Sequence, residues 1–378
     1  MRCKWFSIVV ACLVWSVNAA ATDAKTWLPG VDHNSVISPL GIEASLCGLR
    51  PTMSQGATSE ISMQFGATCS PPPAYVSTSI WIQQAWAISS EAATSMSAYG
   101  ELERGAEPFN DSISRWLAAH RALPLNSRNP IVFASVSALT YVARWKFSNT
   151  VRAKLRPFRG LHQTRTVPFA TNIRFATLQE FPECRRVAIA LADGGTVFLA
   201  NAVRPDRLEA CFEEPPTPYS YASSAVVSLP EIRLESATSL SGILQEHGIR
   251  KIFQASSDPF PGLRRGQPLS DVEQSVHFRI DRHGIGVEAT TASDYALSGG
   301  GPAPHHIVFD SPFEVRVQDS NGNDVADVTI DDVYRCDTDV EELPGRPGAY
   351  PGRYSFYGAR GAEARERSES TSRMSRCL

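Results

Sequence analysis

The chain has 378 residues, with 36 Lys and Arg against 39 Asp and Glu, which gives a formal net charge of −3. This length supplies one large globular domain or two modest ones with a sizeable core. The near-balance of charge excludes the strongly basic class of nucleic-acid-binding chains, so we expect no nucleic-acid partner.

Residues 1–19 are typical of a secretory signal peptide. Arg2 and Lys4 precede an apolar run over residues 5–17, and V-N-A at 17–19 is a small-residue cleavage pattern. The run is too short for a comfortable membrane-spanning helix, and no later stretch approaches the roughly 20 apolar residues that one needs. We therefore expect a secreted, extracellular chain with no membrane partner; an uncleaved anchor is the alternative.

Six of the eight cysteines lie beyond the predicted signal: Cys47, Cys69, Cys184, Cys211, Cys336 and Cys377. An even number in an exported chain permits disulfides, but the spacing does not fix their pairing. No C-x-x-C pattern is present, so a zinc ribbon is not predicted, and we expect no metal and no other cofactor.

The first predicted helix follows a favourable cap. Ser38 is a good N-cap residue, and Pro39 is a good first helical residue. The run N34-S-V-I-S-P-L-G-I resembles the N-x-x-(I/L)-S-P-x-S-I motif of the serpins, the serine-protease-inhibitor superfamily. M53-S-Q-G-A-T-S-E-I61 is similar to the start of that family's next helix, whereas the family's first helix would be missing or vestigial here. The segment C-S-P-P-P-A-Y at 69–75 predicts a linker.

A strand and an amphipathic helix follow in the order found in serpins. Residues 79–82 predict a strand, and residues 110–123 predict a helix. The face of that helix directed at the core would hold Ile113, Trp116, Leu117 and His120. Asn110 begins an N-D-S glycosylation sequon.

Residues 131–145 predict an apolar strand. Within it, S137-A-L-T-Y-V-A-R-W145 resembles the serpin sequence N-A-(I/L)-Y-F-K-G-x-W. The resemblance implies that Trp145 lies where the bait strand first enters the main sheet, and that Ser137 replaces the family's asparagine beneath it. With Ser38 and Pro39, these residues would form the shutter and breach of that sheet.

A basic run follows this strand, with Lys146, Arg152, Lys154, Arg156 and Arg159. Such a run fits a polyanion site or a solvated face of the domain, and we favour the solvated face.

The stretch from residue 228 to residue 284 carries the most specific resemblance. S228-L-P-E-I-R-L234 predicts a strand, and the following helix, from Leu240, ends at Gly248 in the left-handed conformation. Both are similar to the corresponding serpin strand and helix, and the match continues from Leu269 to Gly284 without a gap. The last strand, at 326–330, carries Asp327 where the family is apolar, which argues against a buried position.

The segment after Gly284 is the expected functional element. Apolar and polar residues alternate at 276–281, which predicts a half-buried strand, and small residues alternate again at 285–291, before a Gly/Pro-rich loop. This stretch resembles the serpin reactive-centre region, with F309-D-S-P-F313 as the return strand. The hinge would comprise Gly284, Ile285, Gly286, Val287, Glu288, Ala289, Thr290 and Thr291. An ordinary β-hairpin with a long loop is the alternative.

The resemblance implies a single α+β domain at residues 20–334, with three β-sheets, surrounding helices and an exposed reactive-centre loop. It implies a monomeric inhibitor whose partner is a target serine protease, or a cysteine protease. Cleavage of the loop would let it enter the main sheet, with Ile285, Val287, Ala289 and Thr291 facing the core. Residues 335–378 are rich in Gly, Pro, Ser, Arg and Glu and predict a disordered tail.

Loop length from Gly284 places the reactive bond at Leu297-Ser298, whereas counting back from Phe313 places it a few residues later, among the glycines. Leu297 suits a chymotrypsin- or elastase-like protease. Because no Arg or Lys lies between Gly284 and Phe313, a trypsin-like target is disfavoured.

Other functions find little support in the sequence. The chain has no G-x-S-x-G, H-E-x-x-H, G-x-x-x-x-G-K or Rossmann pattern, so we do not expect an enzyme. His305 and His306 fit a metal site or a polar loop, and we favour the loop. A non-inhibitory serpin-fold binding or carrier protein, or a decayed serpin, remains the alternative function.

Overall fold

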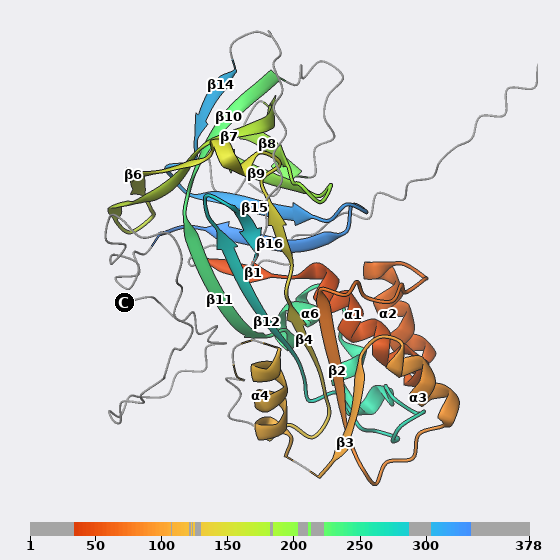
Figure 1. Cartoon of the computed structure of the whole chain (residues 1–378). Coiled ribbons are helices and arrows are strands. Elements are labelled where there is room, and N and C mark those ends of the chain that lie inside the picture. The colour runs from red at the N-terminus through yellow and green to blue at the C-terminus, as the bar shows by residue number, and fades with distance from the viewer. Residues whose placement is uncertain are drawn as a thin grey trace, which may run out of the picture.

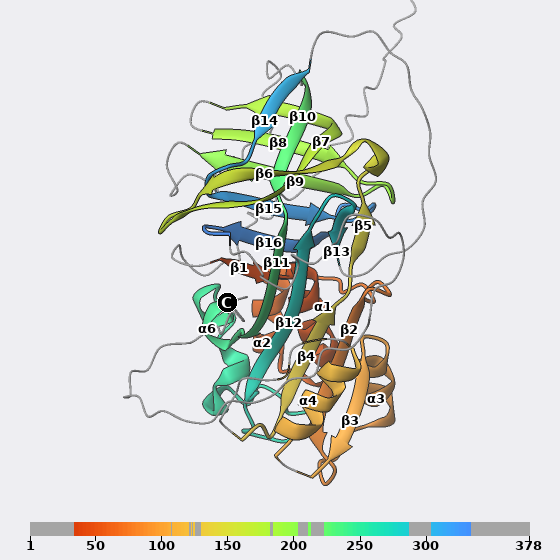
Figure 2. The ribbon, with the colours of Figure 1, turned by 60° about the vertical axis from the view of Figure 1, so that its left-hand side comes forward.

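A seven-stranded and a nine-stranded β-sheet carry the fold (Figures 1 and 2). This computed structural model describes residues 34–106, 108–120, 122, 124, 130–181, 184–202, 211–212, 223–286 and 304–333. The expected signal peptide, the tail at 335–378, the hinge from Val287 to Thr291 and the Leu297-Ser298 bond lie outside these residues. What the sequence predicts for them remains a prediction.

The seven-stranded sheet has the order β3-β2-β4-β12-β13-β5, and β11 pairs along the other edge of β12. Its strands are β2 (Val76–Gln83), β3 (Glu101–Gly105), β4 (Ala134–Leu139), β5 (Val142–Arg144), β11 (Ile232–Ser239), β12 (Asp271–Ile280) and β13 (Gly284–Gly286). β4 and β5 divide the single strand expected at 131–145.

Helices cover both faces of this sheet. Four of them share a core with β2 and β12 on one face: α1 (Pro39–Leu49), α2 (Gln55–Phe65), α3 (Ser90–Ser97) and α6 (Ser241–Glu246). On the opposite face lies α4 (Asn110–Ala119) (Figure 1). It packs on apolar side chains of β2 and β4. Single 3₁₀ turns are η1 (Arg50–Thr52), η2 (Ser148–Thr150), η4 (Lys251–Phe253) and η5 (Ala255–Ser257).

The nine-stranded sheet has the order β1-β16-β15-β9-β8-β7-β10-β14, with β6 on β7. Its strands are β1 (Ser35–Ile37), β6 (Arg152–Arg159), β7 (Thr164–Glu180), β8 (Cys184–Ala190), β9 (Thr196–Ala202), β10 (Ser223–Pro230), β14 (His305–Val308), β15 (Phe313–Gln318) and β16 (Asp324–Ile330). The resemblance implied three sheets. Because β7 pairs with β6 and β10 and, further along, with β8, two of them are joined into one.

The main core lies between the two sheets. Leu139, Val276 and Phe278 of the smaller sheet pack in one cluster with Leu199 and Val315 of the larger sheet. None of the helices within the described residues is long and apolar enough to cross a lipid bilayer.

Local signals in the sequence predict several element ends correctly. Ser38 caps α1 by accepting a hydrogen bond from the Gly41 N–H at 3.0 Å, and Pro39 is the first helical residue. Gly248 follows α6 with φ of 87°, a conformation that favours glycine. The linker at 69–75 contains neither helix nor strand.

Three expectations are corrected by the structure. The helix expected at 110–123 ends at Ala119, and beyond it the Ala122 N–H bonds back to the Leu117 carbonyl at 2.8 Å, five residues earlier, in place of the four-residue spacing of an α-helix. His305 and His306 lie in strand β14 rather than in a loop, so as successive strand residues they point to opposite faces.

The third correction concerns Asp327, which is buried. Its side chain accepts a hydrogen bond from Arg316 Nε at 2.8 Å, and both side chains are almost fully enclosed. The two residues face each other across the β15–β16 hairpin. The charge is therefore tolerated in the core because its partner is built into the neighbouring strand.

We expect Asp327→Ala to lower the free energy of unfolding by about 3–5 kcal/mol, because Arg316 would stay buried without its partner. Urea unfolding followed by tryptophan fluorescence measures the change. The matched control is Asp310→Ala, which breaks the exposed pair with Arg159 and should cost at most about 1 kcal/mol. Equal costs for the two variants would contradict a structural role for the buried pair.

Candidate functional site

The site is the line along which β4 and β12 meet in the seven-stranded sheet, here called the seam. The two strands run parallel and pair over six positions, from Ala134↔Asp271 to Leu139↔Val276. Neighbouring strands on either side, β2 and β11, pair antiparallel with them. The seam therefore joins two antiparallel halves of the sheet through one parallel interface.

A short strand divides the sheet immediately above the seam. β13 lies between β5 and β12 and is antiparallel to both, with Ile285 opposite Ala143 on one side and Ile280 on the other (Figure 2). The Ile285 side chain is 4% exposed and packs in the main core. At this end of the sheet β5 and β12 do not pair with each other, because the three residues of β13 lie between them. Beyond β13 this position closes, and β4 and β12 pair directly.

Two glycines let β13 lie close to β5. A Cβ on Gly284 would lie 2.1 Å from the Ala143 carbonyl oxygen, and one on Gly286 would lie 2.3 Å from that of Tyr141. Gly286 also has φ of 123°, which side chains rarely allow. A residue other than glycine would therefore be strained at Gly286, the last described residue of this segment.

Trp145 holds the head of the sheet together through two hydrogen bonds, while its role at an entering strand stays a prediction. Its indole Nε1 donates to the Asp281 carbonyl at 2.8 Å, and its backbone N–H donates to the His283 carbonyl at 3.2 Å. The Asp281 carboxylate in turn accepts bonds from the N–H groups of His283 and Gly284, at 2.6 and 3.1 Å. The turn into β13 is therefore held from both sides.

Further along the seam, away from β13, Gln274 connects Ser38 with Ser137. The sequence analysis did not predict Gln274 as part of the site. The Gln274 carboxamide accepts from the Ser38 N–H at 2.8 Å and donates to the Ser38 carbonyl at 2.9 Å, and its nitrogen lies 3.5 Å from Ser137 Oγ. Gln274 thus links β12 to the start of α1 and to β4. A glutamine among the inward positions of β12, between Val272 and Val276, is the signal that could have found it.

Glu273 points to the opposite face of the sheet from Gln274, and the sequence analysis did not predict it either. It pairs with Val136 of β4, whose side chain packs under α4, and it is 4% exposed. Burial, with the neighbouring Asp271 carboxylate and a hydrogen bond to it, raises the pKa of Glu273 to about 8. An acid with this pKa holds its proton more readily in the closed seam than it would in water.

The remaining predicted site residues lie elsewhere. Asn110 is the first residue of α4, and its side-chain oxygen accepts a bond from the Ile131 N–H at 3.0 Å. Its glycosylation stays a prediction. The structure brings Ser38 together with Ser137, and Trp145 together with Gly284.

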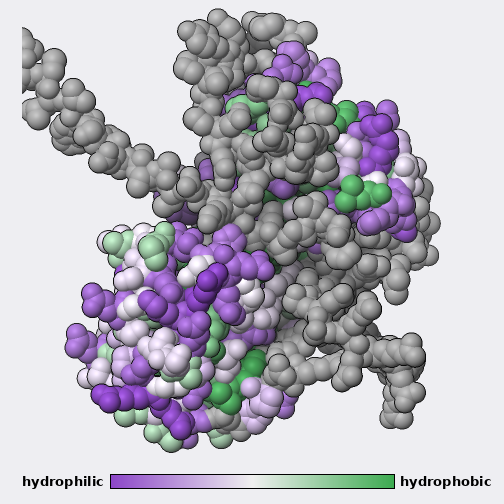
Figure 3. All heavy atoms as spheres, turned by 180° about the vertical axis from the view of Figure 1, so that it is seen from behind, coloured by the Kyte–Doolittle hydropathy of each residue, from purple (hydrophilic) through white to green (hydrophobic). Residues whose placement is uncertain are grey.

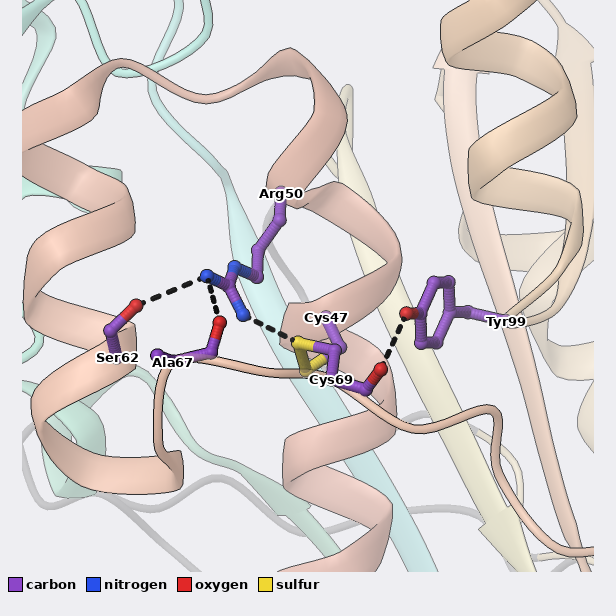
Figure 4. Close-up of a disulfide and its surroundings, with 6 residues drawn as sticks. All are labelled: Cys47, Arg50, Ser62, Ala67, Cys69 and Tyr99. Carbon is purple, nitrogen blue, oxygen red and sulfur yellow. Dashed lines mark hydrogen bonds between the residues drawn. A yellow bond between two sulfur atoms is a disulfide. The ribbon is translucent and has the colours of Figure 1, made fainter.

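Two disulfides answer the pairing question for four of the six cysteines, and Cys336 and Cys377 lie outside the described residues. Cys47 of α1 is bonded to Cys69 of the linker, and Cys184 of β8 is bonded to Cys211. Around the first, Arg50 donates to Cys69 Sγ and to the Ala67 carbonyl, and Tyr99 donates to the Cys69 carbonyl (Figure 4). The linker is therefore fixed against the helix that carries Ser38 at its cap.

Comparison with known proteins places this geometry in context. A family model described as Serpin (serine protease inhibitor) matches residues 133–326, which include the seam, β13 and Trp145. No curated protein sequence matches the chain.

Solved structures with low sequence identity share the fold. Tengpin, a thermophilic serpin in its native state, has a TM-score of 0.66 at 14% identity, over 82% of this chain and 92% of its own. Human thyroxine-binding globulin complexed with its hormone has 0.66 at 14%, over 80% and 93%. Native protease nexin-1 with heparin has 0.62 at 16%, over 79% and 93%.

We expect Gln274→Ala to lower the free energy of unfolding by roughly 1–3 kcal/mol, because it leaves the fully buried Ser38 N–H without a partner and removes one of the two hydrogen bonds to the Ser38 carbonyl. Urea unfolding measures the loss. Gln245→Ala, which removes an exposed side chain of α6, is the control and should cost less than about 0.5 kcal/mol. A loss for Gln274→Ala as small as that of the control would contradict the role of Gln274 as a link.

Glu273→Gln should change how stability depends on pH. Because the pKa of Glu273 is raised in the folded state, its contribution is complete below about pH 4.5 and is lost as the pH rises to about 8. The melting temperatures of parent and variant should be similar at pH 4.5, and the variant should melt higher at pH 8.5. Glu246→Gln, an exposed control on α6, should follow the parent at both values. A pH-independent difference between Glu273→Gln and the parent would refute this account.

Proposed function

This chain belongs to the serpin family, and on that premise we propose that it is a secreted inhibitor of a serine protease that acts by inserting its cleaved loop into the seam. The observation that carries the proposal is the position of β13. It lies between β5 and β12, with Ile285 packed in the core and the seam closed directly below it. Such an arrangement suits a sheet that can accept a further strand.

The pairing of β13 defines a single register for that strand. Counted from the pairing with β5, Ala289 would lie opposite Leu139, and counted from the pairing with β12, it would lie opposite Val276. Leu139 and Val276 already pair with each other across the seam. A strand continuing from Gly286 would therefore meet both neighbours in register, without a shift of β4 against β12.

Insertion would replace one ladder by two. The six pairs of the seam would separate, and β4 and β12 would each pair with the new strand, so about one ladder is gained. Each net hydrogen bond contributes about 1 kcal/mol. Burial of Val287, Ala289 and Thr291 on the core side would add to this, which favours insertion once the loop is cut.

The energy released would act on the protease through the covalent bond formed during cleavage. An acyl-enzyme keeps the protease attached to the end of the entering strand, so insertion drags the protease along the sheet before water can release it. Distortion of its catalytic residues then traps the complex. Leu297 as the residue before the cleaved bond favours a chymotrypsin- or elastase-like target.

Export of the protein is supported by its disulfides. Cys47–Cys69 and Cys184–Cys211 are both formed in the structure, and such bonds persist in oxidising compartments. They agree with the signal peptide predicted at residues 1–19.

A non-inhibitory binding or carrier role is the second candidate. Bulky hinge residues favour it, because slow insertion lets the acyl-enzyme hydrolyse. Ile285 already packs in the core before any cleavage, so of the two bulky residues only Val287 would still have to enter. Human thyroxine-binding globulin, to which this fold is similar, was solved complexed with its hormone.

Incubation with chymotrypsin- and elastase-like proteases tests the proposal. We expect a covalent complex that survives SDS, cleavage at Leu297-Ser298 by mass spectrometry, and a higher melting temperature for the cleaved chain. Cleavage without complex and without a gain in melting temperature would favour the binding role. Neither a complex nor any cleavage between Ala296 and Gly301 would end the inhibitor proposal.

A matched pair of hinge variants tests the insertion step separately. Ala289→Arg would place a charge between Leu139 and Val276, so it should turn the inhibitor into a substrate that is cut without forming a complex. Glu288→Arg, one position away, would face outward and should keep complex formation within about threefold of the parent. Equal behaviour of the two variants would show that the strand does not enter in this register.

A further inference from the structure

The ribbon formed by β6 and β7 is the most unusual surface outside the site. β6 is an edge strand whose described partner is β7 alone, and all its residues except Arg156 and Phe158 are exposed. Of the four large hydrophobic residues that are exposed among those described, three lie on this ribbon and its turn: Leu155, Leu161 and Phe175. In Figure 3, a hydrophobic patch stands out beside hydrophilic residues in the half of the molecule that holds the larger sheet.

The ribbon is also strongly basic for a chain of net charge −3. No Asp or Glu occurs from Ser112 to Gln179, although the chain holds 39 of them, and that stretch includes the whole of β6 and all but the last residue of β7. Arg152, Lys154 and Arg156 share one face of β6 because side chains alternate along a strand. Neither Lys154 nor Arg156 has an acidic partner among the described residues, and Arg156 Nε is buried without a hydrogen-bond acceptor there.

One explanation of this surface is purely protective, because basic side chains and a proline on an edge strand keep it from pairing with the edge of another sheet. Such protection does not require β6 and nearly all of β7 to lack Asp and Glu. Three exposed apolar side chains would also favour contact with another molecule instead of preventing it. The surface has the features of a covered one: an unpaired edge, unmatched positive charge and apolar side chains in the open.

The free edge of β6 offers specific hydrogen-bonding groups. Arg159 turns its N–H away from β7, to the Asp310 carbonyl at 2.8 Å. Since alternate residues of an antiparallel strand point their backbone groups the same way, Ala153 and Leu155 direct theirs to the same edge. An added strand would find two N–H donors and the carbonyls of residues 153, 155 and 157.

The chain itself leaves the described region beside this ribbon. Leu161, in the turn between β6 and β7, donates its N–H to the Asp331 carbonyl at 3.0 Å. The turn also lies against Asp332, since a Cβ on Gly160 would be 1.8 Å from the Asp332 carboxylate. Val333, the last described residue, follows directly.

An acidic segment begins after three intervening residues. Asp337-Thr338-Asp339-Val340-Glu341-Glu342-Leu343 carries four acids in seven residues, and Pro344 then ends it. Residues 334–336 can span ~10 Å. Starting from the turn at Gly160, the segment would run along β6 from Arg159 towards Arg152, which is antiparallel to β6, and its length of ~24 Å fits the ~27 Å of that strand.

We propose that the segment Asp337–Leu343 docks on the free edge of β6 as an added antiparallel strand. Its carboxylates face Lys154 and Arg156, and its apolar side chains cover Leu155. This assignment departs from the disorder that composition predicts for the tail, and only for these seven residues. It is independent of the inhibitor proposal, because neither β6 nor the segment belongs to the seam.

Hydrogen exchange of the full chain tests the docking. The test variant is Asp337→Asn with Asp339→Asn, Glu341→Gln and Glu342→Gln; the control is Glu363→Gln with Glu366→Gln and Glu369→Gln, three acids later in the tail. We expect the amides of Ala153 and Leu155 to exchange at least ~10-fold faster in the test variant than in the parent and the control, since loss of the added strand opens them to water. Equal exchange in all three proteins, or unprotected amides in the parent, would overturn the proposal.

Binding of dextran sulfate separates this occupant from an external polyanion. If the tail covers the ribbon, the test variant should bind dextran sulfate at least ~10-fold more tightly than the parent and the control, because the competing carboxylates are gone. Equally tight binding by all three would show a surface open to external polyanions, and the proposal would fail. Neither result bears on whether the protein forms a covalent complex with a protease.

Discussion

The direct pairing of β4 with β12 is the constraint on which the rest of the structure depends. These two parallel strands close the middle of the seven-stranded sheet, yet at its head β5 and β12 are separated by the width of β13. The sheet is therefore neither fully closed nor fully extended. The same six residue pairs keep the two halves together and mark the space that a further strand would occupy.

Polar side chains contact this interface from both faces of the sheet. Gln274 fastens the inner face to the cap of α1, whereas Glu273 sits on the outer face, next to side chains packed under α4. The Gln274 carboxamide meets the buried N–H and carbonyl of Ser38 with hydrogen bonds, so an apolar residue at this position would leave that N–H without a partner. Glu273 needs no charged partner while it keeps its proton, which its raised pKa favours.

The parts of this picture that sequence predicts are those with a local cause. The Ser38 cap and the Pro39 start of α1 follow from the chemistry of one or two residues. The roles of Gln274 and Glu273 depend on partners in other strands or helices; Gln274 and Ser38, for example, are 236 positions apart. Asp327 is intermediate. The pair Asn321-Gly322 in the sequence is typical of a hairpin turn, and the hairpin register places Arg316 opposite that carboxylate. The disulfides and the joining of two sheets through β7 follow from tertiary arrangement alone.

Asn34, the first described residue, is hydrogen-bonded to residues near the end of the described chain. Its carboxamide oxygen accepts bonds from the N–H groups of Asp331 and Asp332, at 2.7 and 2.9 Å, and its nitrogen donates to the Asp332 carbonyl at 2.6 Å. One side chain therefore staples together positions that are almost 300 apart in the sequence. The two ends of the described region therefore lie next to each other. A circular permutant that joins these two points and has its new ends in the linker at 69–75 would keep the same contacts in a new chain order.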